Sequence, residues 1–266
     1  MKRLTHFLRS NFLLAQTFDG GSIFRHYWLY VTFCFAICYL NIVRTAPIAI
    51  QLVYKKRKFT FHIRQRIDIA VLADIFVNQE YQFEYGDNIK NILDLGANIG
   101  DTAIFYAIHF PDATIYAIEP NPRIFLQLCK NAKQFDNIRC TSAALSSVDG
   151  TIELYESDTH LGFSVIQRNV KSGSVTVKSI TLESMLKKYG VDCFDIIKFD
   201  IEGSETVLLE DPKLPTRTRM ITGEMHDDLA TIPLQPLVHS LRLEDMKTKT
   251  LNSKRYIIFG KINNTI

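Results

Sequence analysis

Acidic side chains and a histidine follow two apolar stretches of this chain. Residues 194–205 read FDIIKFDIEGSE, a pattern typical of a buried strand that ends at Asp200 and Glu202. The later segment GEMHD adds Glu224 and His226. Charged groups are rarely buried unless they are paired or used in chemistry. Because carboxylates and imidazoles can take or orient a proton, the two segments predict acid–base chemistry where these strands end.

Four residues form the predicted catalytic set. Asp200 is the first choice as general base or for orienting the acceptor, because it is expected at a strand tip. His226 is the second choice because its unperturbed pKa lies near neutrality, although a purely structural histidine is an equal alternative. Glu202 and Glu224 complete the set, and Lys198 is expected to pair with one of the strand-end carboxylates. Asp200, Glu224 and His226 could instead hold a hard metal ion, but the prediction is no metal.

A glycine-rich turn, DLGANIGDT, predicts a cofactor site. Gly96 and Gly100 allow a sharp turn and a close approach of a ligand. The spacing is GxxxG rather than GxGxxG, and Asp94 would repel a pyrophosphate but attract an ammonium or sulfonium group. S-adenosylmethionine carries both cations and no phosphate. Asn98 and Thr102 could donate to its carboxylate, helped by a helix N-terminus, with Thr102 as a helix cap being the alternative.

The acidic residue Glu119 ends the next apolar run, ATIYAIEP. A carboxylate at this position can accept hydrogen bonds from both ribose hydroxyls of a cofactor. A solvated strand end is the alternative. The predicted cofactor-binding residues are Asp94, Gly96, Asn98, Gly100, Thr102, Glu119, Pro120 and Ala143.

Strand and helix signals alternate along the chain from residue 59. Apolar runs predict strands at 59–64, 91–97, 113–120, 137–145, 151–156, 174–180, 194–201, 219–228 and 256–262. Helical spacing predicts helices at 67–81, 100–110, 122–135, 181–190 and 205–211. Thr181 is expected to cap the start of the helix at 181–190, and Gly190 to end it. Asp149-Gly150 is expected to form a hairpin turn. This alternation predicts a doubly wound α/β sheet, whose ligands bind beyond the carboxyl ends of the strands.

Four segments in order, ILDLGANIGDT, IYAIEPNP, SAALSSVDGTIELY and DIIKFDIEGSE, resemble the FkbM family of S-adenosylmethionine-dependent methyltransferases. The resemblance spans residues 58–266, and KFDIEGSE is its most diagnostic part. It implies a Rossmann-like class I methyltransferase fold. This is a three-layer sandwich with a seven-stranded, mostly parallel sheet whose last strand is antiparallel.

The resemblance also implies methylation of a hydroxyl oxygen, commonly on a sugar or a polyketide-type secondary metabolite. We therefore expect an S-adenosylmethionine-dependent O-methyltransferase with a small-molecule, glycan or glycolipid acceptor. One alternative is an NAD-dependent oxidoreductase on a Rossmann fold. Another is a non-catalytic, membrane-tethered binding protein. The polar segment 156–173 is expected to form a lid or a wall of the acceptor site.

The first 57 residues are predicted to form a hydrophobic, helical extension before a methyltransferase domain of residues 58–266. Residues 26–43 contain no Asp, Glu, Lys or Arg, and as a helix they would be about 27 Å long, close to the thickness of a bilayer core. Basic residues are denser after this segment, so a spanning helix would place the domain in the cytoplasm. A buried or dimerising helix is the favoured interpretation, and attachment to the cytoplasmic face of a membrane is the second.

Composition narrows the class of partner. The 266 residues carry a net charge of +3, without a basic stripe interleaved with aromatic residues, so nucleic acid is not an expected partner. The five cysteines form no CxxC pair, which is typical of reduced thiols in the cytoplasm. We therefore expect a cytoplasmic protein.

Overall fold

The computed structural model describes residues 48–64, 66–156, 163–164, 174–227, 229–230 and 232–262. The chain divides into two compact units, residues 1–80 and 81–266. In the first unit, β1 (Ile48–Tyr54) and β2 (Arg57–Ile63) form an antiparallel hairpin that is followed by α3 (Arg66–Phe76). The rings of Tyr54 and Phe59 pack on Phe76, with centroids 5.1 and 6.0 Å away. The predicted strand and helix are present as β2 and α3, but the helix ends at Phe76 rather than at residue 81. The described part of the predicted helical extension is wrong, because residues 48–54 form the strand β1.

Two predictions fall on residues outside the described part of the chain. These are the spanning or buried helix at 26–43 and most of the lid at 156–173. In the part that the structure does describe, no helix has both the length and the apolar character needed to cross a membrane.

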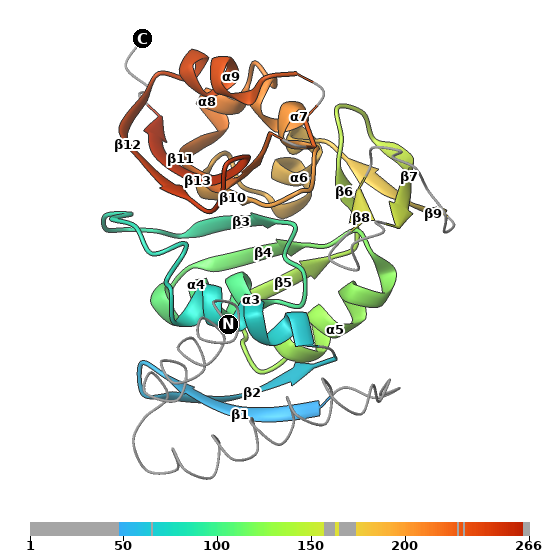
Figure 1. Cartoon of the computed structure of the whole chain (residues 1–266), viewed down its shortest axis with the longest axis vertical. Coiled ribbons are helices and arrows are strands. Elements are labelled where there is room, and N and C mark those ends of the chain that lie inside the picture. The colour runs from blue at the N-terminus through green and yellow to red at the C-terminus, as the bar shows by residue number, and fades with distance from the viewer. Residues whose placement is uncertain are drawn as a thin grey trace. The chain divides into compact units, whose positions relative to one another are not determined.

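A seven-stranded sheet forms the centre of the second unit (Figure 1). Its strand order is β12–β13–β11–β10–β3–β4–β5. The parallel strands are β3 (Asn91–Leu95), β4 (Thr114–Ile118), β5 (Ile138–Thr141), β10 (Phe194–Phe199) and β11 (Thr218–His226). The last strand, β13 (Arg255–Ile262), is antiparallel to both of its neighbours, β11 and β12 (Leu243–Thr250). The predicted mostly parallel sheet with an antiparallel last strand is confirmed.

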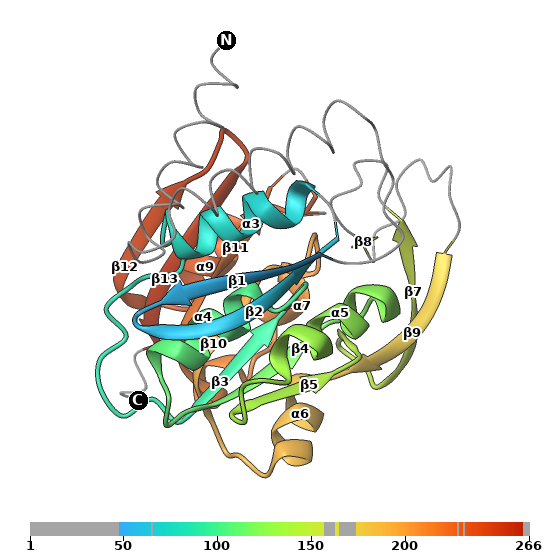
Figure 2. The same cartoon turned by 90° about the horizontal axis from the view of Figure 1, so that it is seen from below.

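Helices cover both faces of this sheet, which gives the predicted three layers (Figure 2). The helices α4 (Asp101–His109) and α5 (Pro122–Ala132) pack on one face. The helices on the other face are α6 (Leu182–Tyr189), α7 (Glu205–Leu209), α8 (Leu214–Arg217) and α9 (Leu234–Ser240). Side chains of these four helices share one apolar core with Leu93, Leu95, Ile197 and Phe199. Because side chains alternate along a strand, Asp94 and Lys198 point to the opposite face.

Local sequence signals account for several helix ends. The side chain of Thr181 accepts a hydrogen bond from the amide of Ser184 at the start of α6, and Gly190 ends that helix with a φ of 66°. Asn121 caps α5 in the same way, with Pro122 in the first turn. These caps confirm the predicted start of α5 and both predicted ends of α6, because each cap depends only on residues within one turn of the helix. The helix α5 ends at Ala132, three residues before its predicted end.

The predicted hairpin at Asp149-Gly150 is wrong. A second sheet has the order β6–β9–β7–β8, formed by β6 (Ala144–Leu145), β7 (Gly150–Glu156), β8 (Phe163–Ser164) and β9 (Ser174–Ile180). There β7 pairs with β9 rather than with the strand before the turn. The carboxylate of Asp149 instead accepts hydrogen bonds from the amide of Thr181 and the hydroxyl of Ser184, at 2.8 and 2.5 Å. The predicted single strand at 137–145 is likewise split between two sheets.

Candidate active site

Three strand ends meet at the carboxyl edge of the parallel sheet. The amide of Asp200, which follows β10, donates to the carbonyl of Leu95 in β3 at 3.0 Å. The amide of Gly96 donates to the carbonyl of Ile118 in β4, also at 3.0 Å. Gly96 has a φ of +73°, and a Cβ atom there would lie 1.9 Å from the carbonyl oxygen of Asp200. Only glycine allows this approach, so the predicted cofactor turn directly contacts the predicted catalytic strand end.

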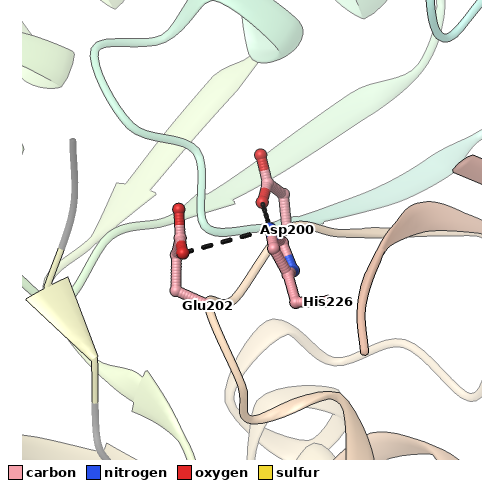
Figure 3. A group of neighbouring side chains, drawn as sticks. All are labelled: Asp200, Glu202 and His226. Atoms are coloured by element: carbon pink, nitrogen blue, oxygen red, sulfur yellow. Dashed lines mark ion pairs between the residues drawn. The ribbon is translucent and has the colours of Figure 1, made fainter. Parts of the chain in front are cut away.

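Three of the predicted catalytic residues, all carboxylates, lie around the imidazole of the fourth, His226. Figure 3 shows His226 with two of them, Asp200 and Glu202. His226, at the end of β11, is fully buried. Its Nε2 atom lies 3.4 Å from Glu224, 3.7 Å from Asp200 and 4.0 Å from Glu202, in each case to a carboxylate oxygen. Its Nδ1 atom lies 2.6 Å from Oε1 of Glu205. The proximity expected for this set is therefore present, whereas the chemical roles stay predictions.

Burial and crowding bring the pKa values of two carboxylates in this cluster close to neutrality and raise the pKa of His226 above it. Burial first, and then the negative charge of Asp200, raises the pKa values of Glu202 and Glu224 to about 7. Burial alone would lower the pKa of His226, but the hydrogen bond to Glu205 and the surrounding carboxylates outweigh it and raise that pKa to about 9. Groups that exchange protons near neutral pH are suited to acid–base chemistry.

Glu205 is part of this cluster, although the sequence indicated it only as an acidic residue in the first turn of a helix. It is the first residue of α7 and is fully buried. Its Oε1 atom also lies 3.2 Å from the amide of Gly203, which has a φ of +98°. The signal available in the sequence was its position close behind the strand end, since a tight turn there returns the chain to the strand tip.

Asp94 is buried and its charge is balanced within the protein. Its Oδ1 atom lies 3.1 Å from Nζ of Lys198, and its Oδ2 atom accepts a 2.6 Å hydrogen bond from the hydroxyl of Thr102. The expectation that Lys198 pairs with a residue after β10 is wrong, because the register of β10 on β3 places it beside Asp94. Burial lowers the pKa of Lys198. Nearby carboxylates, Asp94 foremost, raise it by more than burial lowers it, so the ammonium keeps its charge. The contact of Asp94 with a cofactor stays a prediction.

Glu119 organises the turn on the other side of the cofactor region. Its two carboxylate oxygens accept hydrogen bonds from the amides of Asn98 and Asn121, at 3.0 and 2.8 Å. Asn98 has a left-handed φ of 46°, which directs its amide to this carboxylate. Pro120 follows at the end of β4, and Ala143 is fully buried after β5. These four predicted cofactor-binding residues therefore lie at the ends of β3, β4 and β5.

The N-terminus of α4 begins at this turn without a side-chain cap. Gly100 occupies the cap position with a φ of +94°, and a Cβ atom there would lie 3.0 Å from Cδ1 of Leu128. Asp101 follows in the first turn and is buried, which raises its pKa to about 7. First-turn amides that no side chain caps are ready donors for a carboxylate.

Residues 94–242 match the model of the family described as the Methyltransferase FkbM domain. The chain belongs to this family. The matched FkbM segment includes every predicted site residue and lies inside the predicted domain of 58–266. The boundary of that domain at residue 58 stays a prediction.

Two curated relatives are methyltransferases. The chain is 28% identical over 153 residues to "2-O-methyltransferase NoeI" of Sinorhizobium fredii. The aligned region covers 51% of this chain and 63% of that protein. The chain is 25% identical over 173 residues to "Hexuronic acid methyltransferase AglP" of Haloferax volcanii. This alignment covers 64% of this chain and 70% of that protein. The chain thus spans less than two thirds of the first relative's length.

Among solved structures, the chain resembles M. jannaschii TYW2 in complex with AdoMet with a TM-score of 0.46 and 13% identity. The alignment covers 84% of this chain and 89% of that one. With a TM-score this low, the class I methyltransferase fold is assigned from the strand order of the chain's own sheet.

Proposed function

We propose that this FkbM-family protein is an S-adenosylmethionine-dependent O-methyltransferase that methylates a hydroxyl group of a sugar or glycan. The observation that carries the proposal is the contact between Gly96 and the backbone of Asp200. It joins the glycine turn expected to hold the cofactor to the acidic cluster expected to face the acceptor. The names of two relatives, one a 2-O-methyltransferase and one a hexuronic acid methyltransferase, support an oxygen of a sugar as the acceptor.

The donor and acceptor groups of the glycine turn fit S-adenosylmethionine. Glu119 presents a buried carboxylate at the end of β4, and carboxylate oxygens can each accept more than one hydrogen bond, as two ribose hydroxyls require. The uncapped start of α4 at Gly100 offers amides to the methionine carboxylate. When bound, this cofactor supplies an activated methyl group.

The acceptor side is assigned from exposure. The side chains of Asp200 and Glu202 are 33% and 29% exposed, whereas His226 is fully buried. An acceptor can therefore reach the two carboxylates but not the imidazole. Asp200 and Glu202 would orient the hydroxyl or take its proton, and His226, held by Glu205, would act through them as a positioning residue.

The test is methyl transfer from labelled S-adenosylmethionine. Purified full-length protein is incubated with the cofactor and a panel of sugars, uronic acids and glycolipid extracts, and products that gain one labelled methyl group are sought by mass spectrometry. Asp200→Asn should lower the rate by about 100-fold or more. The matched control is Glu183→Gln, which changes a half-exposed carboxylate on α6 that pairs with Lys213 and Arg217, and it should keep the full rate.

Two results would refute the proposal in different ways. Binding of S-adenosylhomocysteine without transfer to any acceptor would favour a non-catalytic binding protein. Binding of NAD without binding of S-adenosylhomocysteine would favour an oxidoreductase.

A further inference from the structure

His226 presents a buried nitrogen atom that makes no hydrogen bond within the described part of the chain. Its Nδ1 atom is engaged by Glu205 at 2.6 Å, but Nε2 is buried and has no hydrogen-bond partner there. Carboxylate oxygens surround Nε2 at 3.4–4.0 Å, which is too far for a good hydrogen bond. Histidines that bind metal ions commonly have one ring nitrogen on the ion and the other on a carboxylate, as Glu205 is placed here.

The spacing of these atoms suits a common ligand. One oxygen of Asp200, one oxygen of Glu202 and one ring nitrogen of His226 all lie within 4.8 Å of one another. Atoms bound to the same ion at about 2.0–2.2 Å can be up to about 4.4 Å apart. The difference is small, and the two carboxylates are only partly buried, so a change of rotamer can close it.

The charge at this strand end is unbalanced. The carboxylates of Asp200, Glu202, Glu205 and Glu224 surround His226. The guanidinium group of Arg255 lies 3.9 Å from Glu224. Among the described residues, the ion-pair partners of these four carboxylates are the imidazole and the guanidinium, and the ammonium of Lys198 also attracts Asp200. The four carboxylates outnumber these cations, and uncompensated charge in a buried place is costly. A divalent cation placed between Nε2 and the carboxylates would reduce that excess, although Nε2 gives up any proton when it binds the ion.

We propose that Asp200, Glu202 and Nε2 of His226 bind a divalent cation, with Glu205 orienting the imidazole through Nδ1. Carboxylate ligands suit Mn²⁺ as well as Mg²⁺, but an imidazole ligand favours a transition-metal ion over Mg²⁺. Mn²⁺ is therefore the ion of choice. Such an ion would lie where the acceptor hydroxyl is expected, and it would orient that oxygen and lower its pKa. This differs from the sequence-based prediction of a metal-free site. It does not depend on the proposed methyl transfer, because the ion binds the protein's own side chains.

Binding of Mn²⁺ to the full chain tests this proposal. The protein is stripped with a chelator and titrated with MnCl₂, while free Mn²⁺ is followed by electron paramagnetic resonance and binding heat by calorimetry. We expect one saturable site. Asp200→Asn and Glu202→Gln should each weaken binding by about 10-fold or more, and Glu205→Gln by about 10–100-fold, since it removes the charge that orients the imidazole. Glu183→Gln should leave the affinity unchanged.

Circular dichroism spectra show which variants are folded. If the variant of the buried Glu205 is not folded, the variants of the partly exposed Asp200 and Glu202 still test the site. Absence of saturable Mn²⁺ binding, or binding that these substitutions leave unchanged, would overturn the proposal. Binding of S-adenosylhomocysteine and methyl transfer in the presence of a chelator are measured in parallel. A protein that transfers methyl groups with the chelator present and binds no Mn²⁺ would refute the metal site alone.

Discussion

Replacing Lys198 by methionine should destabilise the fold by about 3–5 kcal/mol, because it leaves the carboxylate of Asp94 buried without its counter-ion. The Nζ atom of Lys198 lies 3.1 Å from Oδ1 of Asp94, and the two side chains are 2% and 0% exposed. At an effective dielectric constant of about 20, the attraction at this distance is about 5 kcal/mol. In the wild type this attraction offsets the cost of removing both ions from water, whereas in the variant the cost for Asp94 remains alone.

Urea unfolding followed by far-ultraviolet circular dichroism measures this effect. The control is Lys261→Met, which removes the same kind of side chain from Asp245. That pair is closer, at 2.6 Å, but both side chains are exposed. Solvent screens exposed ion pairs, so the control should leave the urea midpoint unchanged. Comparing the two variants separates the effect of burial from that of distance.

A double variant completes the test. In Lys198→Met with Asp94→Asn the buried charge is absent, so this protein should be more stable than Lys198→Met alone. The reasoning is refuted if Lys198→Met unfolds at the wild-type midpoint. It is equally refuted if the double variant is destabilised by the sum of the two single effects.

Three further predictions concern the glycine turn and its acidic neighbours. In urea unfolding, Gly96→Ala should be destabilised by about 1–3 kcal/mol more than Gly190→Ala. Both glycines have a positive φ, but only a Cβ atom at position 96 would clash with the backbone of Asp200. Equal destabilisation of the two variants would contradict this reasoning. The carboxyl of Asp101 has a pKa of about 7 in the fold, against about 4 when unfolded, so its contribution to stability is lost as the pH rises from about 4 to 7. Asp101→Asn should therefore gain stability relative to wild type between pH 5 and pH 8, measured by urea unfolding at both values, and a constant difference would argue against it. Glu119→Gln should raise the dissociation constant for S-adenosylhomocysteine, measured by calorimetry, by about 10-fold or more, since hydrogen bonds to a charged group contribute about 1.5–3 kcal/mol. An unchanged affinity would exclude Glu119 from the cofactor site.

Local patterns were sufficient for most strands and helices of the second unit. The runs at 91–97 and 113–120 contain the buried parallel strands β3 and β4, as their apolar character indicated. β12 was missed because it is an exposed edge strand, rich in charged residues and without apolar alternation. Edge strands often carry such charges, which prevent pairing with other chains.

Local sequence patterns did not predict the correct partner of a strand or side chain where that partner lies far away in the sequence. Asp149-Gly150 has the composition of a hairpin turn, but β7 pairs with β9 instead of with the preceding strand. Lys198 was expected to pair within its own segment, yet its partner Asp94 lies 104 positions earlier, on the neighbouring strand. Neither choice is encoded in nearby residues, because pairing depends on which strands become neighbours and in what register.

The sequence by itself determined most strands and helices of the second unit and placed Asp200 and His226 at strand ends, because periodicity, glycine turns and caps act over a few residues. It also indicated the FkbM family through segments in a fixed order. The tertiary structure alone decided that Glu205 holds the imidazole of His226 and that Lys198 neutralises Asp94. Those contacts form only when parallel packing brings separate strand ends to one edge of the sheet, where distance and burial set the charge of each group.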